Sequence, residues 1–104
     1  METSDPILAR FRAVLVEIYG DRLDRVVLFG SRARGDGRED SDYDVAVFLK
    51  SLPDRWAELD RLARLRVSFI DDTGAFFDAK PYAATSYQEG SPLMREIREE
   101  GLEL

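Results

Sequence analysis

The 104-residue sequence contains neither cysteine nor histidine. Without cysteine the chain can form no disulfide bond, thiolate nucleophile or zinc–thiolate site. Without histidine it has no Ser-His-Asp or Cys-His catalytic arrangement, no imidazole metal ligand and no histidine general base. Carboxylates, tyrosines, Lys50 and Lys80 remain for acid–base chemistry, and metal ions ligated by oxygen are not excluded.

Positive charge and long apolar runs are also scarce. There are 15 Lys and Arg residues against 21 Asp and Glu residues, so the formal net charge is −6. This charge is unfavourable for binding the phosphate backbone of a nucleic acid, so no direct nucleic-acid partner is expected. No apolar run of roughly eighteen residues occurs and the segment Met1–Asp5 is acidic, which predicts no membrane partner, no signal peptide and a cytoplasmic protein.

The length predicts a single domain over residues 1–104, built from helices and strands in alternation. The predicted elements are a helix from Ser4-Asp5-Pro6 to Tyr19-Gly20, a strand over 26–29, a helical turn over 32–34, a loop over 35–41, a strand over 42–49, a helix opened by Pro53, a strand over 75–83 and a helix from Ser91-Pro92 to Gly101. Trp56 is expected to anchor its helix in the core rather than to stack on a base. These elements predict an α/β (α+β) domain.

Gly30 and Ser31 end the first predicted strand. Gly30 permits a tight turn, and Ser31 is expected to cap the short helical turn that follows, leaving unpaired backbone N–H groups at its positive end. Phosphate oxygens suit such a position. A lone Gly-Ser pair after a strand is more often an ordinary turn, so this feature alone does not establish a site.

Asp42 and Asp44 open the second predicted strand. Side chains two residues apart in a strand lie on one face, so these two carboxylates are expected to lie close together and to repel each other. Hard oxygen ligands beside a phosphate site favour Mg²⁺. A lone Asp-x-Asp is more often a strand-end cap or a solvated pair; the combination with Gly30-Ser31 at this spacing favours a phosphate and metal site.

The run GSRARGDGREDSDYD resembles the Gly-Ser-x10-Asp-x-Asp signature of the DNA polymerase β-like nucleotidyltransferases, and the short chain resembles their minimal nucleotidyltransferase (MNT) branch. The resemblance implies a nucleotidyltransferase fold, with a small mixed sheet covered by helices mainly on one face and acids on the open face. That branch includes antitoxins of HEPN/MNT toxin–antitoxin pairs, which transfer AMP from ATP to a tyrosine of a HEPN ribonuclease. The resemblance therefore implies a type VII-like antitoxin, ATP as substrate, two Mg²⁺ ions and a hetero-oligomer with a HEPN-like toxin.

Members of this family also use a third carboxylate from a later strand. Asp78 is the only acid in the strand predicted over 75–83, and an isolated aspartate among apolar neighbours needs a partner or a metal ion. Asp78 is therefore the expected third acid, with Asp42 and Asp44 as the other catalytic and metal-binding residues. The alternative is an ion pair between Asp78 and Lys80 on the same face.

The resemblance assigns Gly30 and Ser31 to the β- and γ-phosphates of the nucleotide. Arg32 and Arg34 are candidates for neutralising the triphosphate, and Arg38 lies in the same segment; a solvated loop face is the alternative for these arginines. Two other functions stay open: an antitoxin that acts by binding alone, and a nucleotidyltransferase acting on a small-molecule or RNA hydroxyl.

Overall fold

The computed structural model describes residues 5–35 and 42–104, so the predicted loop, with Arg38, lies outside the described residues except for Gly35. The elements are α1 (Pro6–Tyr19), η1 (Gly20–Arg22), β1 (Leu23–Phe29), α2 (Ser31–Arg34), β2 (Tyr43–Leu49), α3 (Arg55–Thr73), β3 (Phe77–Ala83), η2 (Ala84–Gln88), α4 (Pro92–Glu100) and β4 (Leu102–Glu103). The predicted order of helices and strands is confirmed. The two 3-10 helices and β4 were not predicted. Within the described ranges, no helix has the length and apolar character needed to span a membrane.

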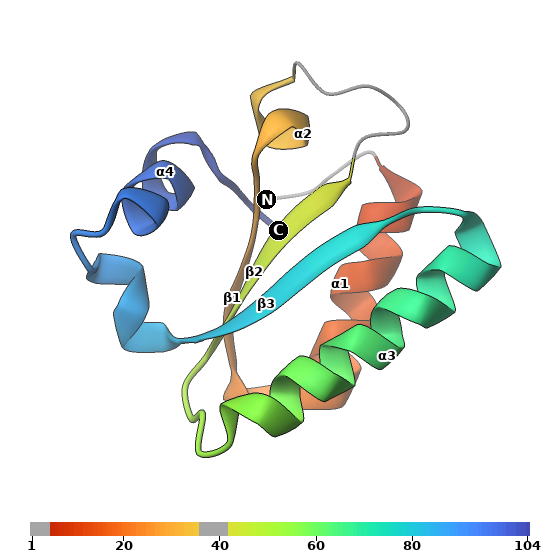
Figure 1. Cartoon of the computed structure of the whole chain (residues 1–104), viewed down its shortest axis with the longest axis horizontal. Helices are drawn as coiled ribbons and strands as arrows, with labels where there is room; N and C mark the ends of the chain where they lie inside the picture. Colours follow the sequence, from red (N-terminus) through yellow and green to blue (C-terminus); the bar gives the residue numbers. More distant parts are fainter. Residues whose placement is uncertain (1–4, 36–41) are drawn as a thin grey trace.

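The four strands form one sheet in the order β3-β2-β1-β4, and this sheet is small and mixed, as the fold class predicted. β1 is antiparallel to both β2 and β4, whereas β2 and β3 are parallel. The end of β1 and the beginnings of β2 and β3 therefore lie at the same end of the sheet, where α2 is also found (Figure 1). Every residue of the predicted phosphate and metal site comes from this end.

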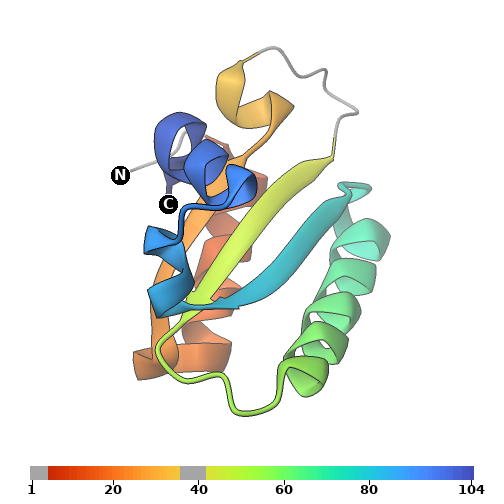
Figure 2. The same cartoon turned by 60° about the vertical axis from the view of Figure 1, so that its left-hand side comes forward.

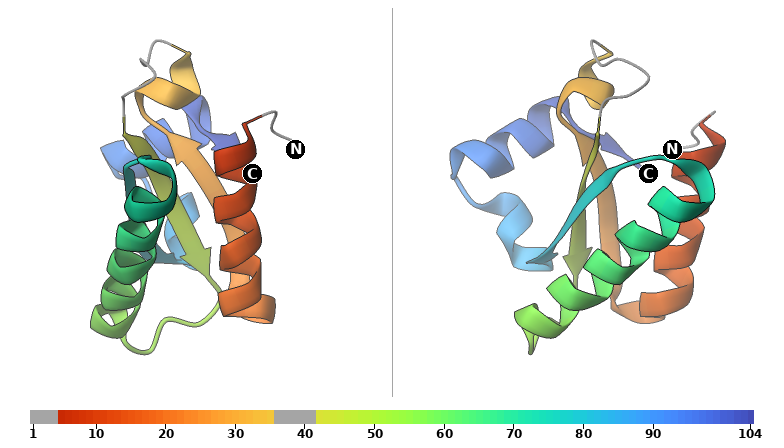
Figure 3. Two further views of the ribbon diagram at one scale, coloured as in Figure 1. Left: turned by 90° about the vertical axis from the view of Figure 1, so that its right-hand side faces the viewer. Right: turned by 45° about the vertical axis from the view of Figure 1, so that its right-hand side comes forward.

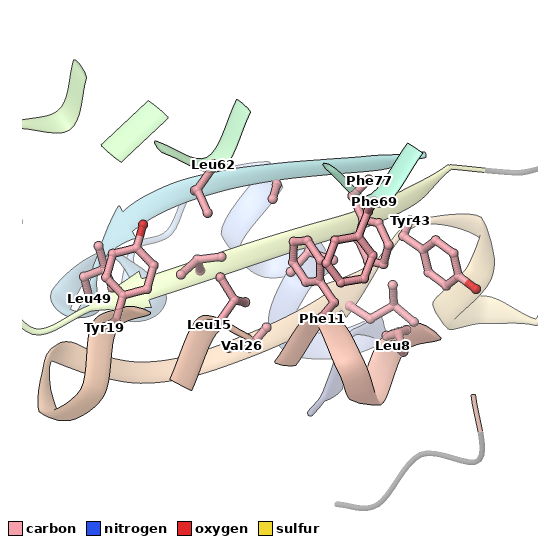
Figure 4. Packing of buried hydrophobic residues seen from close by; sticks show 14 residues of the cluster. Leu8, Phe11, Leu15, Tyr19, Val26, Tyr43, Leu49, Leu62, Phe69 and Phe77 are labelled. Carbon is pink, nitrogen blue, oxygen red and sulfur yellow. The ribbon is translucent and has the colours of Figure 1, made fainter. Parts of the chain in front are cut away.

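One face of the sheet is covered by α1 and α3, which lie on the same side of it (Figure 3). Their apolar side chains pack against the alternate strand residues that point to this face. The centre is a group of aromatic rings (Figure 4). Phe77 stacks on Phe11 at 4.0 Å and on Tyr43 at 4.6 Å between ring centroids, and Phe69 meets it edge-on at 5.3 Å. These rings fix α1, α3, β2 and β3 to one another.

The other face is covered in part by η2 and α4 (Figure 2). Met94 and Ile97 of α4 are buried together with Val27, Ala46 and Phe48 of the sheet. This second, smaller core agrees with the prediction that helices cover mainly one face. It leaves the α2 end of this face for the polar residues of β2 and β3.

The expectation that Trp56 packs in the core is wrong, because its side chain is 80% exposed. The buried positions of α3 are Glu58, Leu62 and Phe69, which follow helical spacing and place Trp56 on the opposite side of the helix. Glu58 is tolerated inside because Arg22 donates to it at 3.0 Å and Arg61 lies 3.5 Å from it. The buried side chain near the beginning of α3 is thus an acid with two arginine partners.

β3 is the outer strand of the sheet, and its free edge is interrupted by Pro81. Proline has no backbone N–H, and the Pro81 carbonyl accepts a hydrogen bond from Arg55 Nη1 at 2.7 Å. At this position the edge therefore offers neither a free donor nor a free acceptor.

The turn from β1 into α2 depends on Gly30. Its backbone has φ 76° and ψ −159°, a conformation that side chains disfavour strongly. A Cβ atom on Gly30 would also collide with the carboxylate of Asp44. Gly30 is the N-cap of α2 and Ser31 is its first residue, with no side-chain capping bond; the expectation that Ser31 caps this turn is therefore wrong, because the glycine backbone starts the helix one residue earlier.

Replacing Phe77 by alanine should lower the free energy of unfolding by about 3–5 kcal/mol, because the ring is buried and contacts three others. The neighbouring substitution Phe76→Ala is the matched control, since the Phe76 side chain is 54% exposed; it should cost about 0.5 kcal/mol or less. Urea denaturation of both variants measures the difference. Equal losses would contradict the packing described for β3.

Gly30→Ala should be more destabilising than Gly35→Ala in the same urea experiment. Both glycines have positive φ, but a Cβ on Gly35 meets open space while one on Gly30 meets Asp44. We expect Gly35→Ala to cost about 1–2 kcal/mol from backbone strain alone. Gly30→Ala should cost more, because steric displacement of Asp44 adds to the strain; a smaller loss than that of Gly35→Ala would argue against the close contact.

Candidate functional site

Asp44 lies at the centre of the candidate site. In the sheet register it is opposite Phe29 of β1 on one side and opposite Asp78 of β3 on the other. Paired residues of neighbouring strands point to the same face, so the Asp44 and Asp78 side chains share the face that Ala46 and Phe48 continue toward α4. The exposed Asp42 precedes Asp44 by two residues, at the beginning of β2.

The electrostatics of Asp44 indicate that acidic groups gather around it. Partial burial raises the pKa of Asp44, and the carboxylates of Asp78, Asp42 and Glu96 raise that pKa further, while Lys80 acts in the opposite sense. The three acids that the sequence indicated thus lie near enough to interact electrostatically, without forming a tight cluster among the described residues. Glu96 of α4 is a fourth, which sequence analysis missed, because its position depends on how α4 packs against the sheet.

Asp78 also has the neighbour that the alternative interpretation expected. Lys80 Nζ lies 3.9 Å from Asp78 Oδ2, and these side chains are 55% and 42% exposed. An ion pair this exposed contributes little, about 0–1 kcal/mol. The Asp78–Lys80 ion pair is therefore present but weak, so it does not prevent Asp78 from acting together with Asp44.

Gly30 and Ser31 lie at the beginning of α2, and Gly30 lies directly beside Asp44. The Gly30 carbonyl accepts hydrogen bonds from the backbone N–H groups of Ala33 at 3.1 Å and Arg34 at 3.2 Å. The N–H groups that precede them in such a turn have no partner within the helix and are suited to anionic oxygens. The collision predicted between a Gly30 Cβ and Asp44 shows how close this turn is to the carboxylate.

The two candidate arginines of α2 take different directions. The Arg32 guanidinium lies over the ring of Tyr43, 4.0 Å from its centroid, and the Tyr43 side chain belongs to the α1 face of the sheet. Arg34 Nη1 lies 3.6 Å from Glu100 Oε2, which links α2 to the end of α4. The structure thus brings Arg34 toward the helix that carries Glu96, and it places the Arg32 guanidinium against Tyr43.

Tyr43 holds the beginning of β2 in place between Asp42 and Asp44. Its ring stacks on Phe77, and its hydroxyl donates a hydrogen bond to Asp5 Oδ2 at 2.6 Å. Burial, together with this bond, raises the pKa of Tyr43 to about 12, so the hydroxyl remains a donor at neutral pH. The other oxygen of Asp5 caps α1, as the predicted helix start implied.

The donor set fits a divalent cation in its chemistry. Carboxylate oxygens are the preferred ligands of Mg²⁺, and the negative charge gathered at the partly buried Asp44 would be lowered by a bound cation. Among residues 5–35 and 42–104, however, no three acidic side chains are grouped tightly enough to hold an ion as they stand. A metal ion would thus draw these carboxylates closer together.

Comparison with known proteins gives relatives at the level of sequence. Residues 8–104 match the nucleotidyltransferase domain family. Two proteins of Methanocaldococcus jannaschii, both named "Putative protein adenylyltransferase", are similar to parts of the chain: MJ0141 is 49% identical over 47 residues and MJ1305 is 43% identical over 60 residues. The matches cover 45% and 58% of this chain, and 48% and 40% of the relatives. The chain therefore matches about half the length, or less, of these curated relatives.

Solved structures confirm the fold. A crystal structure of a toxin–antitoxin with AMP-PNP superposes with a TM-score of 0.63 at 19% identity, covering 90% of this chain and 69% of that chain. A mutant of the toxin–antitoxin MntA–HpeT gives a TM-score of 0.62 at 20% identity, covering 92% and 70%. At these identities the likeness concerns the fold alone. Since the family match extends over nearly the whole described domain, this chain belongs to the nucleotidyltransferase domain family.

Proposed function

We propose that this chain is the antitoxin of a type VII-like toxin–antitoxin pair and acts as a Mg²⁺-dependent protein adenylyltransferase. Its substrates are ATP and a tyrosine of a HEPN-like ribonuclease toxin, with which it forms a hetero-oligomer. The observation that carries the proposal is the position of Asp44, which lies against the Gly30 turn, is paired with Asp78 in the sheet register and follows Asp42 by two residues. The names of the archaeal relatives and the toxin–antitoxin structures of similar fold support the same function.

Each residue has a separate role in this proposal. The backbone at Gly30 and Ser31 binds the β- and γ-phosphates of ATP, because unpaired N–H groups at the beginning of a helix suit anionic oxygens. Asp42, Asp44 and Asp78 would hold two Mg²⁺ ions. When bound, these ions stabilise the charge that develops on the attacking and leaving oxygens. Arg34 and Arg32 neutralise the triphosphate, and Arg32 would have to leave the Tyr43 ring to do so.

The reaction transfers one AMP group and conserves every atom. The tyrosine oxygen of the partner forms a bond to the α-phosphorus, and the bond from this phosphorus to the bridging oxygen of the β-phosphate breaks. Pyrophosphate leaves with that electron pair. Asp78 accepts the phenolic proton, because it is the carboxylate farthest from the phosphate-binding turn in the sheet order β3-β2-β1.

The direct test uses the purified chain, ATP, Mg²⁺ and the HEPN-like protein that the proposal expects the neighbouring gene to encode. The partner's intact mass should increase by one or more AMP groups. Asp44→Asn and Asp42→Ala should abolish the transfer, since each removes a carboxylate from the site. Asp60→Asn is the matched control, because Asp60 is exposed on α3 and pairs only with a neighbouring arginine among the described contacts.

Three results would contradict the proposal. Toxin neutralisation by Asp44→Asn without any change in mass would favour an antitoxin that acts by binding alone. Labelling of a small molecule or an RNA end instead of the partner protein would favour the other acceptor class, which the net charge of −6 disfavours for RNA. A neighbouring gene without a HEPN-like product would remove the proposed acceptor.

A further inference from the structure

Phe76 and Phe77 are adjacent in sequence but occupy opposite environments. Phe77 is 2% exposed and contacts three aromatic rings, whereas Phe76 is 54% exposed and contacts no other aromatic ring among residues 5–35 and 42–104. Burial alternates along β3, with Phe77 and Ala79 buried and Asp78 and Lys80 more exposed. Continuing this alternation by one residue places Phe76 on the face of Asp78.

The backbone of Phe76 is held firmly at the candidate site. Its carbonyl accepts a hydrogen bond from the Tyr43 N–H at 2.8 Å, and Tyr43 lies between Asp42 and Asp44. The register pairs Tyr43 with Phe77, so Phe76 lies across from Asp42. An exposed apolar ring thus occupies a fixed position at the rim of an acidic site.

The chemistry of the proposed reaction indicates which substrate the Phe76 ring would contact. In-line transfer requires the attacking oxygen and the departing pyrophosphate to lie on opposite sides of the α-phosphorus. If pyrophosphate is held at Gly30-Ser31, at the end of β1, and the phosphorus lies over Asp44 of β2, the acceptor approaches over the beginning of β3. Phe76, which directly precedes β3, is an exposed apolar residue at that position.

We propose that Phe76 docks the acceptor protein, by contacting an apolar side chain of the segment that carries the modified hydroxyl. This inference rests on the proposed function. An exposed aromatic ring that becomes buried on association typically contributes much of the binding energy of an interface. Phe76 is therefore a positioning residue: it fixes the acceptor segment and touches neither the phosphates nor the metal ions.

The test compares Phe76→Ala, Phe76→Leu and Trp56→Ala with the wild-type chain in the AMP-transfer assay. Trp56→Ala is the matched control, because Trp56 is also an exposed aromatic residue but lies at the beginning of α3, at the other end of the sheet (Figure 2). Phe76→Ala should raise the KM for the acceptor at least about fivefold, with the KM for ATP and the melting temperature unchanged. Phe76→Leu should restore most of the lost affinity, and Trp56→Ala should behave as wild type.

Different outcomes separate this inference from the proposed function. An unchanged acceptor KM in Phe76→Ala, with normal transfer by the wild type, overturns the inference and leaves the proposed function intact. A raised KM for ATP also overturns it, because the ring would then stack on the nucleobase. If the wild type transfers no AMP, the proposed function fails. The affinity of the chain for the HEPN-like protein, measured by calorimetry, then tests the docking role alone. Weaker binding by Phe76→Ala than by the wild type supports this role, and equal binding by both, or no binding by either, overturns it.

Discussion

The side chain of Tyr43 is the constraint on which the candidate site depends. Because successive residues of a strand point to opposite faces, a ring fixed in the core between two acids forces both acids to the other face. Phe77 and Asp5 fix that ring by stacking and by a hydrogen bond. The same contacts join the beginning of α1 to β2 and β3, so the core and the site are built from one set of interactions.

The site also shows how a small domain tolerates concentrated negative charge. The acids lie at the end of the sheet rather than in its middle, where Val45, Val47 and Leu49 are fully buried. Asp44 is partly buried, and this burial, together with the neighbouring carboxylates, raises its pKa. Among the described residues, the ion pairs include no strong cationic partner for Asp44, so these neighbouring carboxylates lower stability there, as is common where side chains are arranged for ligands rather than for packing.

The sequence predicted the elements and indicated acids that lie near one another in the candidate site, because local chemistry determines both. Gly30, Asp42 and Asp44 belong to one short segment, and Asp78 is the only acid of its strand, so spacing alone could relate them. Tertiary packing determined what spacing could not reveal. Trp56 is exposed and Glu58 is buried because Arg22 reaches Glu58 from another element, and Glu96 comes near Asp44 only through the packing of α4. The sequence predicts Ser31 as the N-cap of α2, but the N-cap is Gly30, whose positive φ lets the helix begin one residue earlier.

The interrupted edge of β3 has a consequence for how the chain meets other molecules. An outer strand with unpaired backbone groups can template the addition of further strands, and a long apolar one promotes aggregation. Pro81 removes a donor from this edge and Arg55 occupies the acceptor beside it, so continuous pairing along the whole strand is blocked. Association at β3 must then rely on side chains rather than on a backbone ladder, which favours recognition of a particular partner over indiscriminate self-assembly.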